Sequence, residues 1–357
     1  MRKLVSIRKI TGIEPIVGAD RIEIVQVDGW EVVAQKRIHS IGDTVVYFEL
    51  DSFLPESDSR FESFMKFGTR TFDGVVGHRV KTVRLKGVYS QGVIMPVSEF
   101  PEIADPQEDA DYSEVIGVVK WEAPQERGEG MGYQGDKKGT FPWFLRKSDQ
   151  ERIQNLYGKL SQTNYETEFV GTLKMDGSSI TVGFVLGEKY EDKRFFFCSR
   201  NQELKLPECA ITPESLKEQG KFFQGAYNSK LFTKVLELHK MYGGYYAIQG
   251  ELVGAGIQSN FEKFDTYQVF AYNIFDIEKQ QFVDYNTFTQ MAEAVDLQIC
   301  PVVYQKQRIL QEPLKDILAL ANGTGLNAEY REGIVWKQVD GDCQFKAISN
   351  RYLEKQK

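Results

Sequence analysis

The chain has 357 residues, of which 41% are hydrophobic and 13% aromatic, so it can bury the cores of two domains or of one large domain with an appendage. This composition excludes a globally disordered protein, and no apolar run is long enough to span a bilayer, so we expect a cytoplasmic protein without a membrane segment. The formal net charge of −7 argues against non-specific coating of nucleic acid but is compatible with a local basic groove.

Cysteine and histidine usage narrows the chemistry further. The four cysteines are scattered and none stands at the spacing of a zinc site, so we expect reduced thiols at Cys198, Cys209, Cys300 and Cys343. The chain has only three histidines, which argues against catalysis by a Ser-His-Asp triad.

Residues 1 to about 100 form short alternating runs separated by Gly and Asp turns. Residues 21–27 and 30–34 flank Asp28-Gly29, which predicts a β-hairpin. About five short strands in such a segment indicate a small barrel or sandwich. One stretch gives the segment a basic edge, formed by Arg79, Lys81, Arg84 and Lys86.

Residues 101–140 are acidic and Pro-containing at first, then rich in Gly and charge, which is typical of a linker. From residue 141 to residue 357 the apolar spacing is mixed, so the chain as a whole is expected to be α+β. Helices are predicted at about 149–156, 228–242, 287–295 and 313–321. Strands are predicted at 194–201, 245–253, 267–275, 333–337 and 343–348.

The most informative stretch is Lys174-Met175-Asp176-Gly177, which lies between the apolar runs 168–170 and 180–185. We expect the lysine to leave a strand and face a pocket, with Gly177 allowing the chain to turn back. A lysine placed in this way can act as an amine nucleophile if its pKa is lowered. The tetrapeptide is weak evidence alone, since it arises by chance in roughly one chain in ten of this length, usually as a turn with a solvated lysine.

Five further stretches follow it in order: Ser199-Arg200-Asn201, residues 250–254, residues 270–276, residues 332–335 and Phe345-Lys346. With this order and spacing the chain resembles the covalent nucleotidyltransferases, which include polynucleotide ligases and RNA capping enzymes. The N-terminal strands, residues 151–155 and residues 345–350 make it most similar to ATP-dependent RNA ligases with an OB domain before the catalytic domain. DNA ligases and capping enzymes carry an OB domain after the last lysine strand, whereas here about a dozen residues follow Lys346.

The resemblance implies an OB-like β-barrel over residues 1–100, which binds RNA. Residues 141–357 would then form a nucleotidyltransferase (adenylyltransferase, ATP-grasp-like) domain with antiparallel sheets and flanking helices. The implied reaction joins an RNA 3′-OH to a 5′-phosphate through lysyl–AMP and RNA–adenylate intermediates, in RNA repair. The implied substrate is a nicked duplex or a broken structured RNA, and the implied protein is a monomer. The basic edge would contact this RNA, although a solvated strand edge protected by charge explains it equally well.

The resemblance also implies roles for single residues. Lys174 would attack the α-phosphorus of ATP, with Lys346 contacting the α-phosphate and Asp176 completing the catalytic set. Mg²⁺ (or Mn²⁺) would be held, directly or through waters, by Asp176, Glu251 and Glu332, here called the acidic trio; Glu251 would also reach the ribose. Arg152 and Arg200 would bind phosphates of ATP or of the RNA 5′ end. Either Phe270 or Phe275 would stack on adenine unless both are core residues, and Val335 completes the nucleotide-binding set.

Two departures from the family pattern concern phosphate binding. Many relatives have an arginine shortly after the Asp-Gly, where this chain has Ser178-Ser179. Some relatives have two lysines in the last strand, where this chain has Gln344 and Lys346. On a strand both side chains would face the pocket of Lys174. Two other functions stay open at this point: a DNA ligase with the same chemistry, and an inactive nucleotidyltransferase that only binds RNA.

Overall fold

A computed structural model of the protein describes residues 3–108, 110–122, 137–191, 195–207 and 211–355. Cys209 and the Gly-rich part of the predicted linker lie outside these ranges. The chain forms two compact units, the first from residues 1–123, 151–164 and 350–357 and the second from residues 124–150 and 165–349.

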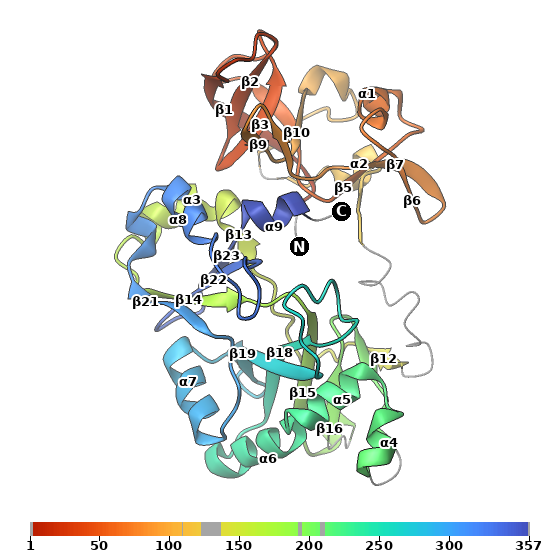
Figure 1. Cartoon of the computed structure of the whole chain (residues 1–357), viewed down its shortest axis with the longest axis vertical. Helices are drawn as coiled ribbons and strands as arrows, with labels where there is room; N and C mark the ends of the chain where they lie inside the picture. The colour runs from red at the N-terminus through yellow and green to blue at the C-terminus, as the bar shows by residue number, and fades with distance from the viewer. Residues whose placement is uncertain (1–2, 109, 123–136, 192–194, 208–210, 356–357) are drawn as a thin grey trace. The chain divides into compact units, whose positions relative to one another are not determined.

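The first unit contains a five-stranded antiparallel sheet in the order β10-β4-β1-β2-β3 (Figure 1). Its strands are β1 (Val5–Pro15), β2 (Ile22–Val27), β3 (Trp30–Gln35), β4 (Thr44–Phe48) and β10 (Val93–Pro96). The predicted hairpin is confirmed, because Val27 pairs with Trp30 across a turn in which Asp28 adopts a φ of 50°. The sheet curls over buried aromatic side chains that include Trp30, Tyr47 and Phe48, as expected for the predicted OB-like barrel.

A second sheet in this unit has the order β11-β5-β7-β6. Its strands are β5 (Ser52–Pro55), β6 (Arg70–Phe72), β7 (Val75–Arg79) and β11 (Val119–Lys120), and a separate hairpin is formed by β8 (Val83–Leu85) and β9 (Val88–Ser90). The short helices are η1 (Ser59–Phe61), α1 (Glu62–Met65), η2 (Val97–Glu99) and α2 (Ser113–Ile116).

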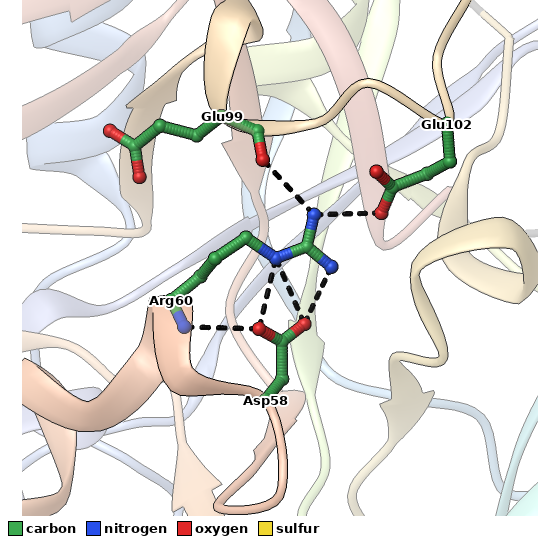
Figure 2. Close-up of polar contacts among 4 residues, drawn as sticks. All are labelled: Asp58, Arg60, Glu99 and Glu102. Carbon is green, nitrogen blue, oxygen red and sulfur yellow. Dashed lines mark hydrogen bonds and ion pairs between the residues drawn. The ribbon is translucent and has the colours of Figure 1, made fainter.

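Arg60 ties the η1 turn to the segment that follows η2 (Figure 2). Its guanidinium pairs with Asp58 at 2.6 Å and with Glu102 at 2.7 Å, and it donates to the carbonyl of Glu99 at 3.2 Å. The hydrogen bond from Arg60 lowers the pKa of Asp58. The guanidinium also lies 4.4 Å from the ring centre of Phe100, so a single side chain holds two turns against the core.

Two helices that follow the predicted linker in sequence belong to the first unit: α3 (Ile153–Thr163) and α9 (Asn350–Lys355). The indole of Trp30 donates to Asn155 at 2.6 Å, and Gln91 donates to Asn350 at 3.1 Å. The structure therefore divides the chain differently from the predicted domains, because two short segments of residues 141–357 pack with the N-terminal strands. Strand β13 (Glu151–Arg152) directly precedes α3.

The second unit contains a seven-stranded antiparallel sheet in the order β12-β17-β16-β15-β18-β19-β20 (Figure 1). Its strands are β12 (Lys137–Thr140), β15 (Ser178–Phe184), β16 (Phe195–Cys198), β17 (Gln202–Leu204), β18 (Tyr246–Val253), β19 (Gln268–Asp276) and β20 (Gln281–Phe282). Helices α5 (Lys221–Asn228), α6 (Leu231–Tyr242) and α7 (Tyr285–Ala294) pack their apolar sides into one core with β15, β18 and β19.

A further antiparallel set in this unit runs β23-β22-β14-β21. These strands are β14 (Phe169–Lys174), β21 (Val302–Gln307), β22 (Gly333–Gln338) and β23 (Gln344–Ile348). The remaining short helices are α4 (Pro213–Lys217), α8 (Leu314–Leu320), η4 (Glu188–Tyr190) and η5 (Ile309–Gln311). The antiparallel sheets with flanking helices confirm the predicted α+β class.

The predicted helix over 228–242 is α6, which begins at Leu231, and it is preceded by α5, a helix that the sequence did not predict. They are separated at Lys230, whose φ of 55° is incompatible with a continuous α-helix. The predicted stop at Gly243 is confirmed, with a φ of 76°. Among the described residues, no helix combines the length and apolar character needed to cross a membrane. The described cysteines, Cys198, Cys300 and Cys343, are free thiols.

Candidate active site

Strand pairing places four of the predicted residues on one face of the β14–β22–β23 sheet. Lys174, the last residue of β14, lies opposite Gly333 of β22. Two residues after Gly333 on β22, Val335 lies opposite Lys346 of β23. Residues that lie opposite each other in an antiparallel pair face the same side, as do residues two apart on one strand. Lys174, Val335, Lys346 and Gln344 therefore share a face, as the alternation in β23 predicts.

Gly177 brings the second sheet close to Lys174. A Cβ atom at this position would lie 2.3 Å from the carbonyl oxygen of Leu252 and 2.8 Å from Cγ of Glu251, so only glycine allows this approach. The need for glycine arises from this close packing, whereas the sequence suggested only a sharp turn. Immediately afterwards Ser179 pairs with Glu251 on β18, which places this carboxylate beside the lysine turn.

Lys174 and the acidic trio form one electrostatic group. The Nζ atom of Lys174 lies 2.7 Å from Oε1 of Glu332. Burial lowers the pKa of Lys174, but Glu332, Glu251 and Asp176 together outweigh this effect and raise it. Burial also raises the pKa of Glu251 to about 8 and that of Glu332 to about 7, although Lys174 opposes both shifts. The carboxylates therefore favour the protonated form of Lys174, and a cation close to them would favour release of the nucleophilic amine.

The acidic trio fits a divalent cation held through water molecules. Across the described part of the chain, no three His, Cys, Asp or Glu side chains are close enough to ligate one ion directly. Oε2 of Glu332 is nevertheless buried with no hydrogen-bond partner among the described residues, so a carboxylate oxygen is available to a cation or its waters. Carboxylate oxygens, used directly or through water, are the ligands that Mg²⁺ prefers in proteins. Of the two predicted modes, this geometry favours the water-mediated one.

Strand β19 carries an aromatic residue that the sequence analysis missed. Gln249 pairs with Asn273 and Gly250 with Ala271, so Tyr272 is an extra residue in the strand, a β-bulge. Bulges often redirect a side chain next to an active site. The hydroxyl of Tyr272 lies 3.0 Å from Oγ of Ser179, and burial raises its pKa. The signal available in the sequence was the Phe270-Ala271-Tyr272 alternation.

The two predicted adenine-stacking candidates are core residues. Phe270 is 4% exposed and packs against Phe264, with a ring-centre distance of 5.8 Å. Its cluster includes Leu173 and Met175, so it lies near the lysine strand, and the partly buried Tyr272 packs against the same cluster. Phe275 is fully buried in a different cluster and is not brought together with Lys174.

Lys337 is a third lysine of the site, and the sequence did not single it out. It is 3% exposed and on the same face of β22 as Val335. Its ammonium donates to the backbone carbonyl of Tyr272 and, at 2.9 Å, to Oδ1 of Asn273. Lys337 therefore links β22 to the bulge of β19, and burial lowers its pKa to about 8.

We expect the stability of the wild type relative to Lys337→Met to rise with pH. Between about pH 8 and pH 10.5 the unfolded lysine holds a proton that the folded one does not, so folding becomes more favourable as the pH increases through this window. The depression from 10.5 to about 8 corresponds to at most about 3 kcal/mol. Urea unfolding of the wild type and Lys337→Met at about pH 7 and pH 10 measures this change in unfolding free energy. Lys240→Met, at an exposed position on α6, is the control. If the difference in unfolding free energy between the wild type and Lys337→Met does not vary with pH, Lys337 is charged in the folded protein.

Arg200 lies at the rim of a pocket in the second unit. The side chain is well exposed and lies 3.4 Å from Asp149, a weak surface pair that a ligand phosphate can replace. The floor of the pocket is polar and includes Gln249, which is buried, donates through Nε2 to the carbonyl of Arg146 and leaves Oε1 without a partner among the described residues. The lining residues are Phe141, Lys147, Ser148, Asp149, Ser179, Thr181, Arg200 and Gln249.

Two other predicted groups belong to the first unit. Arg152 is buried, with its guanidinium 5.6 Å from the ring centre of Trp30. Of the basic edge, Arg79 is 11% exposed, pairs with Asp51 at 2.8 Å and lies 4.0 Å from the ring centre of Trp121. Arg79 therefore has a structural role, while Lys81, Arg84 and Lys86 are exposed.

The chain is similar to known proteins in both sequence and structure. Residues 4–97 match the model of an OB-fold domain, and residues 167–350 match the model of an RNA ligase. No curated protein sequence matches the chain. The structure is similar to that of Naegleria gruberi RNA ligase with pyrophosphate, with a TM-score of 0.87 and 35% identity, covering 99% of each chain. A lysine-to-alanine variant of the same ligase, solved with ATP and manganese, gives a TM-score of 0.86 and 34% identity, again covering 99% of each chain. A glutamate-to-alanine variant with AMP and manganese gives a TM-score of 0.86 and 34% identity, covering 99% of each chain.

Proposed function

The chain belongs to the RNA ligase family, and from this premise we propose that it seals RNA 3′-OH and 5′-phosphate ends with ATP, in the repair of broken RNA. The observation that carries the proposal is Lys174, held at the end of β14 within 2.7 Å of Glu332 and on one face with Lys346. The solved structures of the Naegleria gruberi ligase contain ATP, AMP or pyrophosphate. ATP is the substrate of lysine adenylylation, AMP is the group transferred and pyrophosphate is the leaving group.

In the first step Nζ of Lys174 attacks the α-phosphorus of ATP, forming a lysyl–AMP phosphoramide and releasing pyrophosphate. The acidic trio would hold Mg²⁺ or Mn²⁺ through waters, and this ion, when bound, neutralises charge on the phosphates. Glu332 keeps the resting lysine paired and oriented, and Lys174 must lose its proton before it can attack. Lys346 stabilises the charge that gathers on the α-phosphate.

The nucleoside would lie between the two sheets that carry these residues. We assign Glu251 to the ribose hydroxyls and Val335 to one side of the adenine. Tyr272, held in its bulge by Lys337, is better placed than Phe270 or Phe275 to stack on the other side, because it is only partly buried. Arg200 and Arg152 remain candidates for the phosphates of ATP or of the RNA.

In the second step a phosphate oxygen of the RNA 5′ end attacks the phosphorus of lysyl–AMP, which frees Lys174 and forms RNA–adenylate. In the third step the RNA 3′-OH attacks the 5′-phosphate, forming the phosphodiester and releasing AMP. The pocket beside Arg200 suits the RNA end because hydroxyl and amide groups line it next to Glu251. Lys81, Arg84 and Lys86 of the first unit would bind the phosphates of a nicked duplex or a broken structured RNA.

Nicked duplexes that differ only in strand composition test the substrate class. We expect sealing when the 3′-OH strand is RNA and little or none when both strands at the nick are DNA. Equal sealing of an all-DNA nick would support the rival DNA ligase. Failure to seal any nick, with RNA binding retained, would support the rival in which the nucleotidyltransferase is inactive.

A further inference from the structure

Residues 254–267, here called the linking loop, connect β18 to β19. Glu251 lies on β18, three residues before the loop begins. Three of its non-glycine residues adopt left-handed backbone conformations, with φ values of 45° for Gln258, 42° for Asn260 and 58° for Lys263. Such conformations are costly for residues with a Cβ atom and persist where surrounding contacts impose them. The shape of the loop is therefore fixed by what it contacts.

One contact is with Asp176. Oγ of Ser259 donates a hydrogen bond to Oδ2 of Asp176 at 2.6 Å. Since Asp176 lies two residues after Lys174, this bond attaches the linking loop to the turn that carries the nucleophile. It also orients one carboxylate oxygen of Asp176.

The second contact is made by Glu262, a buried carboxylate that is 4% exposed. It accepts hydrogen bonds from three consecutive backbone N–H groups, those of Leu326 at 3.0 Å, Asn327 at 2.6 Å and Ala328 at 3.0 Å. Consecutive N–H groups that converge in this way form an anion-binding nest, which offsets the cost of burying the charge. A Cβ atom on Gly325 would lie 2.2 Å from Oε1 of Glu262, so the nest closes tightly around this one side chain.

The nest residues, 326–328, lie a few residues before Glu332 of the acidic trio in the sequence. Phe261 stacks on Tyr330, with ring centres 5.1 Å apart and planes 6° apart. The next residue, Arg331, is 5% exposed and donates to backbone carbonyls at the end of α8, including that of Leu320 at 2.6 Å. Glu332 is the next residue after Arg331. The linking loop therefore contacts or adjoins the segments that carry all three members of the acidic trio.

We propose that Glu262 is a positioning residue for the divalent cation, an inference that rests on the proposed function. A cation held through waters depends on the spacing of carboxylates that come from three separate strand ends. Glu262 fixes the segment before Glu332 relative to the linking loop, which in turn is anchored at Glu251 and, through Ser259, at Asp176. Loss of the Glu262 charge should loosen this spacing and weaken cation binding more than it slows the reaction at saturating cation.

The test compares Glu262→Gln with the wild type in full-length protein. Groups that orient the metal ligands without contacting the metal themselves typically contribute about 10- to 100-fold to metal affinity. We therefore expect the Mg²⁺ concentration for half-maximal single-turnover adenylylation to rise at least about 10-fold, with the rate at saturating Mg²⁺ within about threefold of wild type. Glu293→Gln on α7, an exposed glutamate, is the matched control and should shift neither quantity.

A second readout does not depend on turnover. Binding of Mn²⁺ can be followed by electron paramagnetic resonance in a Lys174→Ala background with ATP, using ATP alone as the blank. Adding Glu262→Gln to this background should raise the Kd for Mn²⁺ at least about 10-fold. Ser259→Ala, which removes only one hydroxyl, provides a mild variant if Glu262→Gln does not fold, and it should shift Mn²⁺ binding in the same direction.

Unchanged Mn²⁺ binding in both Glu262→Gln and Ser259→Ala would overturn the inference and leave the proposed function intact. A fall in the maximal rate with an unchanged Mg²⁺ dependence would likewise overturn it, because that pattern indicates a structural role alone. A wild type that forms no protein–AMP adduct at any Mg²⁺ concentration would overturn the proposed function, and the inference with it.

Discussion

Lys174→Ala should abolish covalent transfer of AMP to the protein, yet the variant should still join RNA that already carries a 5′-adenylate. The substitution removes the amine that pairs with Glu332 of the acidic trio at 2.7 Å. The final joining step needs no lysyl intermediate, so a pre-adenylated substrate bypasses the loss. Gel assays with α-labelled ATP and with pre-adenylated RNA measure the two activities separately.

Lys240→Ala is the matched control, since Lys240 is an exposed lysine on α6. It should be labelled as strongly as the wild type. Labelling of Lys174→Ala would mean that another nucleophile accepts AMP. Loss of both activities in a folded Lys174→Ala protein would mean that the lysine also supports the joining step.

Lys346→Ala should slow adenylylation by at least about 10²-fold, whereas Gln344→Ala should cost no more than about tenfold. Both residues share a face with Lys174, but only Lys346 carries a charge that can stabilise the α-phosphate. Burial raises the pKa of Glu332, and the charge of Lys346 opposes this rise, so Lys346 acts on the same group of charges. Gln344 instead accepts a hydrogen bond from Gln150 at 3.4 Å and can offer only neutral hydrogen bonds to a ligand.

Single-turnover adenylylation rates at saturating ATP and Mg²⁺ decide between the two residues. Lys346→Arg keeps the charge and should recover part of the lost rate. If Gln344→Ala is the more damaging substitution, the cationic role of Lys346 is wrong and the pocket depends on the amide of Gln344 instead.

The sequence was sufficient to predict those parts of the fold and site that depend on local patterns. Alternation around Asp28-Gly29 predicted the β2–β3 hairpin, and alternation in β23 placed Gln344 and Lys346 on one side. The resemblance carried by the ordered motifs implied that Lys174 and Glu332 serve one nucleotide site, and the structure joins them by an ion pair.

The remaining features depend on contacts between distant segments, which no local pattern records. Helix α3 packs with the first unit because Trp30 reaches Asn155, 125 residues further along the chain. Tyr272 faces the site because a bulge adds one residue to β19, and a period-two pattern cannot place such an insertion. Glu262 resembles any solvated loop glutamate in the sequence, since its three N–H partners lie more than 60 residues away.

The role of Lys174 is tested most directly by incubating the wild-type protein with α-labelled ATP and Mg²⁺ and mapping the modified residue by mass spectrometry. We expect one AMP per chain, attached through Nζ of Lys174 and released when pyrophosphate is added back. An unlabelled protein, or a label on any residue other than Lys174, would contradict it.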